Sequence, residues 1–230
     1  MRFETGNVEA IVYDVDGTLV DSNYEHTIAW ARAFKQAGVE VPTWRIHRHV
    51  GMGGDQLVPA VAGEDVAERL GDRIRELEKD RYRELIGEVR PFPGAEDILA
   101  TCRDAGVAVI LASSAKGEEL ERYLELLDAD QFADAWTSSR DVDATKPEPD
   151  LVEVALTKAG TRAAVMVGDS VWDIVAAGRA GIRTIGLLTG GFGEAELTDA
   201  GAVDVFESLE ELEGALRNGL LTTMDAADAG

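Results

Sequence analysis

The chain has 230 residues, 45% of them apolar, which is enough to bury a full hydrophobic core in one large domain or in a core with a smaller lobe. Its formal net charge of -22, from 44 acidic and 22 basic residues, would repel nucleic acid. No run approaches the roughly 18 apolar residues of a membrane helix, and the opening MRFETGNVEA lacks the apolar region of a secretory signal. We therefore expect a cytoplasmic protein that binds neither nucleic acid nor a membrane.

The acidic residues are spread along the whole chain, and the basic residues comprise 17 Arg but only 5 Lys. Two explanations are open: a salt-rich cytoplasm such as that of a halophile, or an ordinary acidic protein from an organism with a high-GC genome. Cys102 is the single cysteine. An intramolecular disulfide is therefore impossible, and we expect this thiol to be buried as a small apolar side chain.

Short apolar runs that can form buried strands recur along the chain, and amphipathic helical patterns separate most of them. One helix is expected over Ala95–Ala105, followed by Gly106 as a stop signal. Strands that alternate with helices form a parallel sheet covered on both faces, so we expect an α/β fold with a Rossmann-like, doubly wound parallel sheet. The predicted strands are Ala10–Tyr13, Val107–Ala112, Ala163–Val167, Thr184–Leu187 and Val203–Val205.

A long helix-rich stretch separates the first predicted strand from the second, which indicates an inserted α-helical cap domain. Helices are expected at Tyr24–Ala37 and Asp65–Leu85, with a flexible loop at Gly51–Gly54 between them. The breaker cluster Arg90–Gly94 marks the return to the core. The predicted domains are a core of residues 1–22 and 88–222, a helical cap of residues 23–87, and a frayed acidic tail of residues 223–230.

Three of the apolar runs end in polar residues. The first runs into Asp14, the second into Ser113 and Ser114, and the third into Asp169. The carboxyl ends of parallel strands meet at one edge of a sheet, where ligands bind, so this pattern predicts a functional site. Lys146 precedes a proline-rich turn that opens a further helix.

These segments resemble the haloacid-dehalogenase-like phosphatases over essentially the whole chain. The stretch Asp14–Ser22, DVDGTLVDS, resembles the first motif of that family, and Ser113 and Lys146 resemble the second and third. The fourth motif resembles Gly168–Asp173, GDSVWD. Four motifs in order on predicted strands are a specific signal, whereas one DxD triplet alone more often marks a solvated turn or an Asx cap.

The resemblance implies a magnesium-dependent hydrolase whose nucleophile is Asp14. Asp14 would attack phosphorus and form an aspartyl-phosphate, while Asp16, two residues further on, would donate a proton to the departing alcohol and then take one from water. Mg²⁺ would be bound by Asp14, the backbone carbonyl of Asp16 and Asp169, with Asp173 holding a metal-bound water. For Asp169 and Asp173, the simpler alternative is capping of the following helix.

Positive charge and hydrogen-bond donors complete the implied site. Lys146 would pair with Asp14 and the transferring phosphoryl group, and Ser113 would donate its hydroxyl to the phosphate together with backbone N–H groups near Ser114 and Gly17. The cap loop Val50–Gln56 resembles the segment that selects substrate, with hinges near Ser22–Asn23 and Arg90–Phe92. Substrate contact and a solvated helix position are both open for Arg45, His47 and His49; His26 has no expected role, and Trp172 is expected to fill space.

The expected substrate is a small phosphorylated metabolite, either phosphoglycolate-like or a sugar phosphate, and the chain is expected to be a monomer or a homodimer. Dehalogenases proper are disfavoured because Asp16 is present. Phosphosugar mutases of the same cap type remain an alternative, although Val50 and Gly54 stand where those enzymes carry an anion-binding Lys and Arg. A catalytically silent metal-binding module is a weaker alternative, because the chain retains Asp14, Asp16, Lys146 and Asp169. A receiver-type signalling domain is also weaker, because such domains are shorter, lack an inserted helical lobe and do not need Asp16.

Overall fold

The computed structural model describes residues 7–115, 117–139, 141–142 and 144–222. The predicted acidic tail, 223–230, lies outside these residues. Within them, a central parallel sheet has the strand order β5-β4-β1-β6-β7-β8. The strands are β1 Ala10–Asp14, β4 Ala108–Ala112, β5 Ala135–Thr137, β6 Ala164–Gly168, β7 Arg183–Leu187 and β8 Asp204–Phe206. The five predicted strands are thus present with small boundary shifts, and β5 was not predicted.

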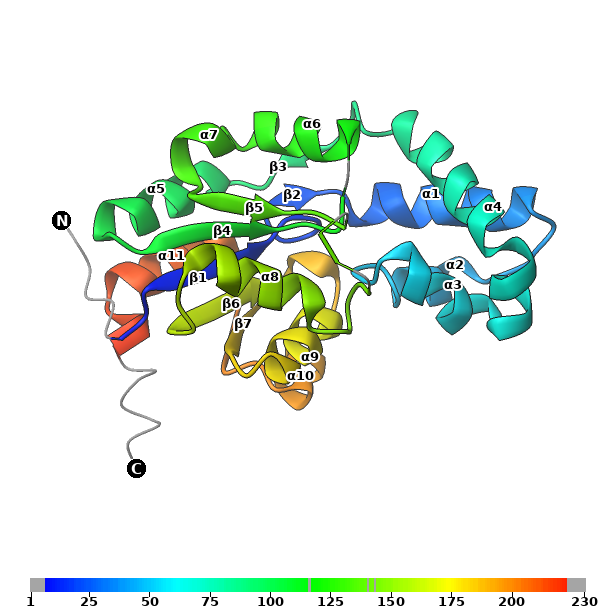
Figure 1. The fold of residues 1–230 in the computed structure, drawn as a ribbon. Coiled ribbons are helices and arrows are strands. Elements are labelled where there is room, and N and C mark those ends of the chain that lie inside the picture. The colour runs from blue at the N-terminus through cyan, green and yellow to red at the C-terminus, as the bar shows by residue number, and fades with distance from the viewer. Residues whose placement is uncertain (1–6, 116, 140, 143, 223–230) are drawn as a thin grey trace.

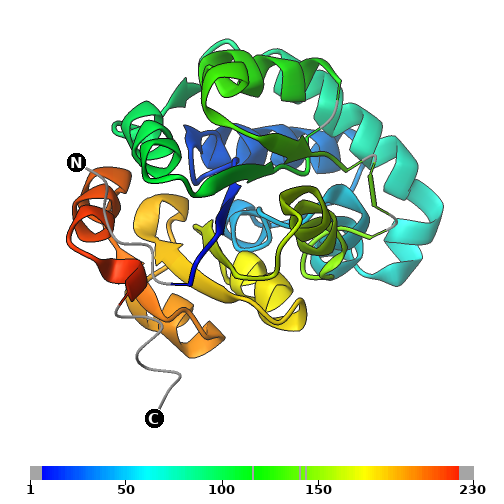
Figure 2. The ribbon, with the colours of Figure 1, turned by 60° about the vertical axis from the view of Figure 1, so that its left-hand side comes forward.

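Helices cover both faces of this sheet (Figures 1 and 2). Side chains of β1 alternate between the two faces, with Ile11 and Tyr13 in one apolar cluster and Ala10 and Val12 in the other. The doubly wound α/β class is therefore confirmed. The core helices are α5 Ala95–Ala105, α6 Glu118–Leu126, α7 Ala129–Phe132, α8 Asp150–Ala159, α9 Val171–Arg179, the short 3₁₀ helix η1 Leu188–Gly190, α10 Glu194–Ala200 and α11 Leu209–Arg217.

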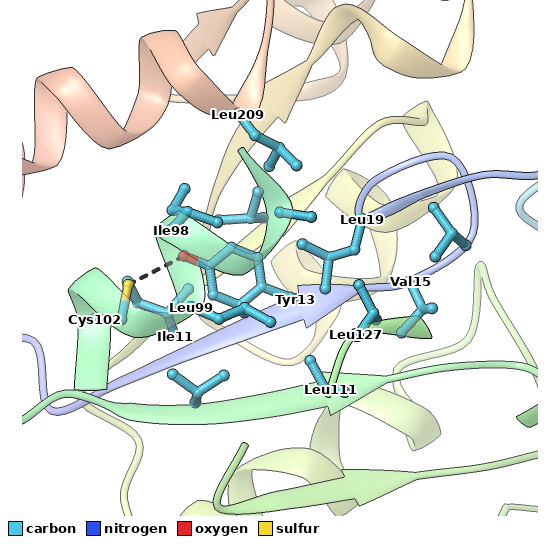
Figure 3. Close-up of a cluster of buried hydrophobic side chains, with 14 of the residues drawn as sticks. Ile11, Tyr13, Val15, Leu19, Ile98, Leu99, Cys102, Leu111, Leu127 and Leu209 are labelled. Carbon is cyan, nitrogen blue, oxygen red and sulfur yellow. Dashed lines mark hydrogen bonds between the residues drawn. The ribbon is translucent and has the colours of Figure 1, made fainter. Parts of the chain in front are cut away.

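One face of the sheet packs around Tyr13, whose ring lies among leucine and isoleucine side chains (Figure 3). Its hydroxyl shares a 3.2 Å hydrogen bond with the Sγ atom of Cys102 on α5. Burial raises the pKa of Cys102 to about 12. The expectation that this thiol is a buried, free side chain is confirmed.

Four helices form a separate helical lobe, on the right in Figure 1. It has its own apolar core, in which Trp30, Phe34, Leu57 and Ile74 are buried. Two short antiparallel strands stand where the chain leaves and re-enters the sheet domain, next to the predicted hinges. These elements are α1 Asn23–Gln36, α2 Thr43–His47, α3 Gly54–Ala62, α4 Glu64–Arg83, β2 Val20–Asp21 and β3 Arg90–Pro91.

The loop expected at Gly51–Gly54 is shorter than predicted, because Gly54 is already the first residue of α3. α5 ends as the sequence indicates, with Gly106 in the left-handed conformation at φ 84°. Among the described residues, none of the helices has both the length and the apolar character that crossing a bilayer requires.

Candidate active site

The predicted site residues meet at the carboxyl edge of the sheet. β1 lies between β4 and β6, so the strand order reverses beside it, and a crevice forms where the connections on its two sides diverge. Asp14 ends β1, while Ser113 and Asp169 directly follow β4 and β6. Three segments far apart in the sequence are thereby brought together by strand pairing alone.

Lys146 reaches this edge from the connection between β5 and α8. Its Nζ atom donates a 2.5 Å hydrogen bond to Oδ1 of Asp14 and lies 2.6 Å from Oδ1 of Asp173, an ion pair without hydrogen-bond geometry. The three side chains are at most 3% exposed. Burial alone would lower the pKa of Lys146, but the two carboxylates outweigh it and raise that pKa above its ordinary value. The ammonium group is therefore charged.

Asp14 is surrounded by more negative than positive charge. Burial raises the pKa of its carboxyl well above the ordinary value; Lys146 acts in the opposite direction, and Asp173, Asp169 and Asp16 raise it further. One ammonium group cannot balance this many buried carboxylates. The local charge excess is what a bound cation would relieve.

Asp169 is held from two sides. Its Oδ1 accepts a 2.7 Å hydrogen bond from the Thr18 hydroxyl, and its Oδ2 accepts a 2.8 Å bond from the Asn23 amide. Burial and the neighbouring Asp173 raise the pKa of Asp169 to about 7. Carboxylate oxygens of Asp14, Asp169 and Asp173 all lie within 4.8 Å of one another. A buried all-oxygen donor set of this kind fits a hard cation such as Mg²⁺.

Asp173 is more deeply involved than the sequence suggested. It is fully buried, pairs with Lys146, and caps α9 through reciprocal hydrogen bonds with Ser170, while its expected hold on a metal-bound water stays a prediction. One side chain therefore both caps α9 and forms an ion pair with Lys146 in the candidate site. Its role in positioning Lys146 was not predicted.

Asp16 occupies different surroundings from Asp14. It accepts a 2.7 Å hydrogen bond from the Ser22 hydroxyl, and Nε2 of His26 lies 3.3 Å from the same oxygen. Burial by itself would raise the pKa of Asp16, but hydrogen bonding and charge from His26 dominate and lower it. The neighbouring carboxylates, Asp14 and Asp16, thus differ in the direction of their pKa shifts.

His26 is a site residue that sequence reasoning missed. Besides Asp16, its ring contacts Glu78 at 3.0 Å and the Tyr123 hydroxyl at 3.3 Å, and it stacks on Tyr82 with centroids 3.7 Å apart. Burial would lower the pKa of His26, but these acidic partners raise it well above the ordinary value. No local signal could have found it, because its partners come from α4 and α6, far along the chain.

Of the predicted phosphate-binding residues, some line the cavity and others are buried away from it. Ser114 lines the cavity described below, whereas the Ser113 hydroxyl is fully buried and accepts a 3.0 Å hydrogen bond from the N–H of Ala115. Gly17 was expected near a phosphate-binding N–H group, but its own N–H donates to the carbonyl of Val20. Gly17 instead allows a close turn at φ 75°, where a Cβ would collide with the side chains of Asn23 and Asp169.

A cavity of 670 Å³ opens between the sheet edge and the helical lobe. Asp14, Asp16 and Lys146 line it on the core side, and the loop Val50–Gly54 and residues of α1 and α4 line it on the lobe side. The volume is in the range of small-molecule sites, roughly 300–1,000 Å³. The candidate nucleophile thus lines a partly open cavity of substrate size.

The lobe contacts the core directly beside the third and fourth motifs. Asp55 accepts hydrogen bonds from the N–H and hydroxyl of Thr145, at 3.2 and 2.5 Å, one residue before Lys146. A Cβ at Gly53 would overlap the Thr145 side chain, and one at Gly51 would lie 2.8 Å from the Ser170 hydroxyl. The glycines of the loop therefore permit a close approach that larger residues would prevent.

Two of the three lobe residues considered for substrate contact pack against the core. His47 stacks on Tyr24 and Phe192, and His49 stacks on Trp172. Trp172 was expected only to fill space, yet its indole N–H also donates a 3.2 Å hydrogen bond to the carbonyl of Arg48. The third, Arg45, donates to the carbonyl of Ala60 within the lobe.

The doubly wound sheet thus carries a buried cluster of carboxylates and one lysine at its switch point, where ligands bind in such folds. The profile of the family described as Haloacid dehalogenase-like hydrolase matches residues 11–187. The chain belongs to that family and is a phosphatase-type hydrolase of it.

Three known proteins illustrate the similarity. A phosphoglycolate phosphatase from Agrobacterium fabrum is 30% identical over 192 residues, covering 78% of this chain and 80% of that protein. A putative pyrophosphatase PpaX from Caldanaerobacter subterraneus is 25% identical over 194 residues, covering 77% and 80%. The crystal structure of a hydrolase from Pseudomonas syringae superposes with a TM-score of 0.85 at 30% identity, covering 91% of this chain and 98% of the other.

Proposed function

We propose that the protein is a Mg²⁺-dependent phosphatase that hydrolyses a small phosphate monoester through an aspartyl-phosphate formed on Asp14. The observation that carries the proposal is the buried Asp14–Lys146 pair, which lines a partly open cavity of substrate size. The phosphatase names of the relatives support it. Phosphoglycolate-like esters and sugar phosphates are the substrate classes to test first.

The residues present fit the proposed cation. Asp14, Asp169 and the backbone carbonyl of Asp16 would hold Mg²⁺, and the buried oxygen cluster at Asp14, Asp169 and Asp173 has the donor chemistry that this ion prefers. When bound, Mg²⁺ would neutralise negative charge on the nucleophile and on the phosphate. Burial and the neighbouring carboxylates raise the pKa values of Asp14 and Asp169, and a bound cation would oppose both shifts.

The chemistry then divides between two carboxylates. An oxygen of Asp14 attacks phosphorus while the bond from phosphorus to the leaving oxygen breaks, and Asp16 gives that oxygen a proton. Water then attacks the aspartyl-phosphate, Asp16 takes its proton, and Asp14 and inorganic phosphate are released. Lys146 orients Asp14 and offsets the charge of the transferring group throughout.

The decisive experiment compares wild type with Asp14→Asn on a panel of phosphate monoesters with Mg²⁺, at low and at high salt. We expect phosphate release to fall by at least ~10³-fold in the variant, which corresponds to about 4 kcal/mol in the barrier. Asp21→Asn is the matched control, because Asp21 is an exposed carboxylate in the same motif. Equal activity of Asp14→Asn and wild type would show that the nucleophile is wrongly assigned.

The same assay separates the other functions considered. A mutase would convert one sugar phosphate into its isomer with little release of phosphate, and a silent binding module would bind Mg²⁺ without turnover. A receiver-type domain would accumulate a long-lived phospho-aspartate. We favour hydrolysis over a mutase because Val50 and Gly54 stand where the mutases carry an anion-binding Lys and Arg. We favour it over a silent module or a receiver-type domain because Asp16, which would receive the proton from water, is retained at the cavity beside Asp14.

A further inference from the structure

The turn that carries Lys146 is held at its two ends by different parts of the molecule. The N–H of Glu148 donates a 3.0 Å hydrogen bond to the carbonyl of Thr145, which closes a turn with Lys146 inside it. At the far end, Arg179 of α9 donates hydrogen bonds of 2.9 and 2.8 Å to the Pro147 carbonyl and the Glu148 carboxylate. This end of the turn is therefore fixed by the sheet domain.

The other end of the turn is held by the helical lobe. Asp55, the second residue of α3, accepts hydrogen bonds of 3.2 and 2.5 Å from the N–H and the hydroxyl of Thr145. Figure 1 shows the chain before α8 reaching the lobe next to α3. Thr145 is only 7% exposed. The residue next to Lys146 is thus anchored across the boundary between the lobe and the sheet domain.

The lobe loop is shaped for this contact. A Cβ at Gly53 would overlap the Thr145 side chain, so a glycine is what lets the loop backbone come this close. An acidic residue in the first turn of a helix ordinarily acts through its charge at the helix N-terminus. The Asp55 carboxylate does more, because both of its oxygens also accept hydrogen bonds from a residue of the other domain.

The position of the Lys146 ammonium group leaves little room for error. Its Nζ atom lies 2.5 Å from an oxygen of Asp14 and 2.6 Å from an oxygen of Asp173. Groups that stabilise developing charge must be held within about 0.5 Å of their productive position. A turn that is released at one end can pivot about the other, and its lysine then leaves the place between the two carboxylates. Docking of the lobe loop and placement of the lysine are therefore linked.

Building on the proposed phosphatase function, we propose that Asp55 is a positioning residue, which sets the Lys146 turn through Thr145 when the lobe loop is docked. Asp55 acts through Thr145 and not on the reacting atoms. The Asp14–Lys146 pair is then correctly assembled only with the lobe in place. Turnover is thereby tied to a docked lobe.

Kinetics of the full-length protein with Mg²⁺ and p-nitrophenyl phosphate test the proposal. Asp55→Ala and Thr145→Val should each lower kcat by at least ~10-fold and change KM by less than ~3-fold, because a displaced Lys146 stabilises the transition state less. The double variant should be no slower than the slower single variant, since both substitutions remove one contact. Thr145→Ser, which keeps the hydroxyl, should retain most of the activity.

Asp65→Ala is the matched control. Asp65 is the exposed second residue of α4, as Asp55 is of α3, so its replacement removes the same first-turn charge from a helix of the lobe. We expect it to change neither kcat nor KM.

Unfolding in urea with EDTA is a second readout, which needs neither activity nor metal. Lys146→Met should lower the unfolding midpoint by at least about a third less in an Asp55→Ala background than in wild type, because the lysine is already displaced. In an Asp65→Ala background the full loss should remain. If Asp55 only stabilised α3, the loss caused by Lys146→Met would be the same in all three backgrounds.

Four results would overturn the inference: wild-type kcat in Asp55→Ala, a rise in KM alone, effects of Asp55→Ala and Thr145→Val that multiply in the double variant, or an undiminished loss in urea. If wild type hydrolyses neither p-nitrophenyl phosphate nor the ester panel, the proposed function itself fails. The urea series then still decides whether Asp55 positions Lys146.

Discussion

Replacing Lys146 by Met should destabilise the protein strongly when no divalent cation is present. The substitution keeps most of the side-chain volume but removes the ammonium group that lies 2.5 Å from Asp14 and 2.6 Å from Asp173. Both carboxylates are almost completely buried and would lose their only close cation among the described residues. Breaking a buried ion pair from one side costs about 3–5 kcal/mol.

For a chain of this length, 1 kcal/mol shifts the melting temperature by roughly 2–4 °C, so Lys146→Met should melt about 6–20 °C below wild type in EDTA. The measurement is thermal unfolding followed by circular dichroism, with urea unfolding as a second readout. Adding Asp173→Asn to Lys146→Met should recover part of the loss, since one uncompensated charge is removed.

Lys158→Met is the matched control for this experiment. Lys158 is 36% exposed and lies 3.6 Å from Asp141, itself 38% exposed, so its loss should change stability by about 0.5 kcal/mol or less. If the free energy of unfolding of Lys146→Met in EDTA lies within about 1 kcal/mol of the wild-type value, the buried carboxylates do not depend on Lys146, and the electrostatic account of the site is wrong.

Three other outcomes are expected. Gly53→Ala places a Cβ that would overlap Thr145, and it should lower the free energy of unfolding by about 1–3 kcal/mol and lower kcat/KM. Gly87→Ala, which has open space around it, should change neither quantity. Equal effects of the two variants in denaturation and in kinetics would refute the close approach of the loop to the core. The thiol of Cys102, with a pKa of about 12 and complete burial, should react with a disulfide reagent at pH 8 only after denaturant is added, and rapid labelling of the folded protein would contradict this. Removal of metal by EDTA should abolish phosphate release, and Mg²⁺ should restore it; activity that persists in EDTA would exclude the proposed cation.

The sequence could predict the features that depend on local patterns. Apolar runs identified β1, β4, β6, β7 and β8, because each buried strand is short, apolar and bounded by turn or polar residues. The motif residues at the ends of three of these strands were found for the same reason. β5 escaped because it has only three residues, Ala135–Thr137, and only two of them are apolar.

Contacts between distant segments could not be predicted in this way. His26 carries no neighbouring signal, and its contact with Tyr123 spans 97 positions. The pairing of Lys146 with Asp173 likewise depends on how the turn before α8 and the start of α9 are placed in space, which spacing along the chain does not encode.

The site divides its tasks between a rigid sheet edge and the helical lobe. Asp14 is fixed at the end of a central strand, and its partner Lys146 comes from the core. Asp16 lies just beyond that strand, and its hydrogen-bonding partners Ser22 and His26 belong to the connection into the lobe and to α1. Carboxylates two residues apart therefore experience different charges, which is the condition for one to act as nucleophile and the other as acid and base.

The directions of the two pKa shifts describe the protein before substrate enters. Asp14 has a raised pKa and Asp16 a lowered one, whereas the proposed mechanism requires an ionised Asp14 and a protonated Asp16. A phosphate dianion beside Asp16 favours its protonated form, and positive charge beside Asp14 favours its ionised form. We therefore expect the roles to be established by the charges of the bound complex, with His26 holding Asp16 ionised until substrate arrives.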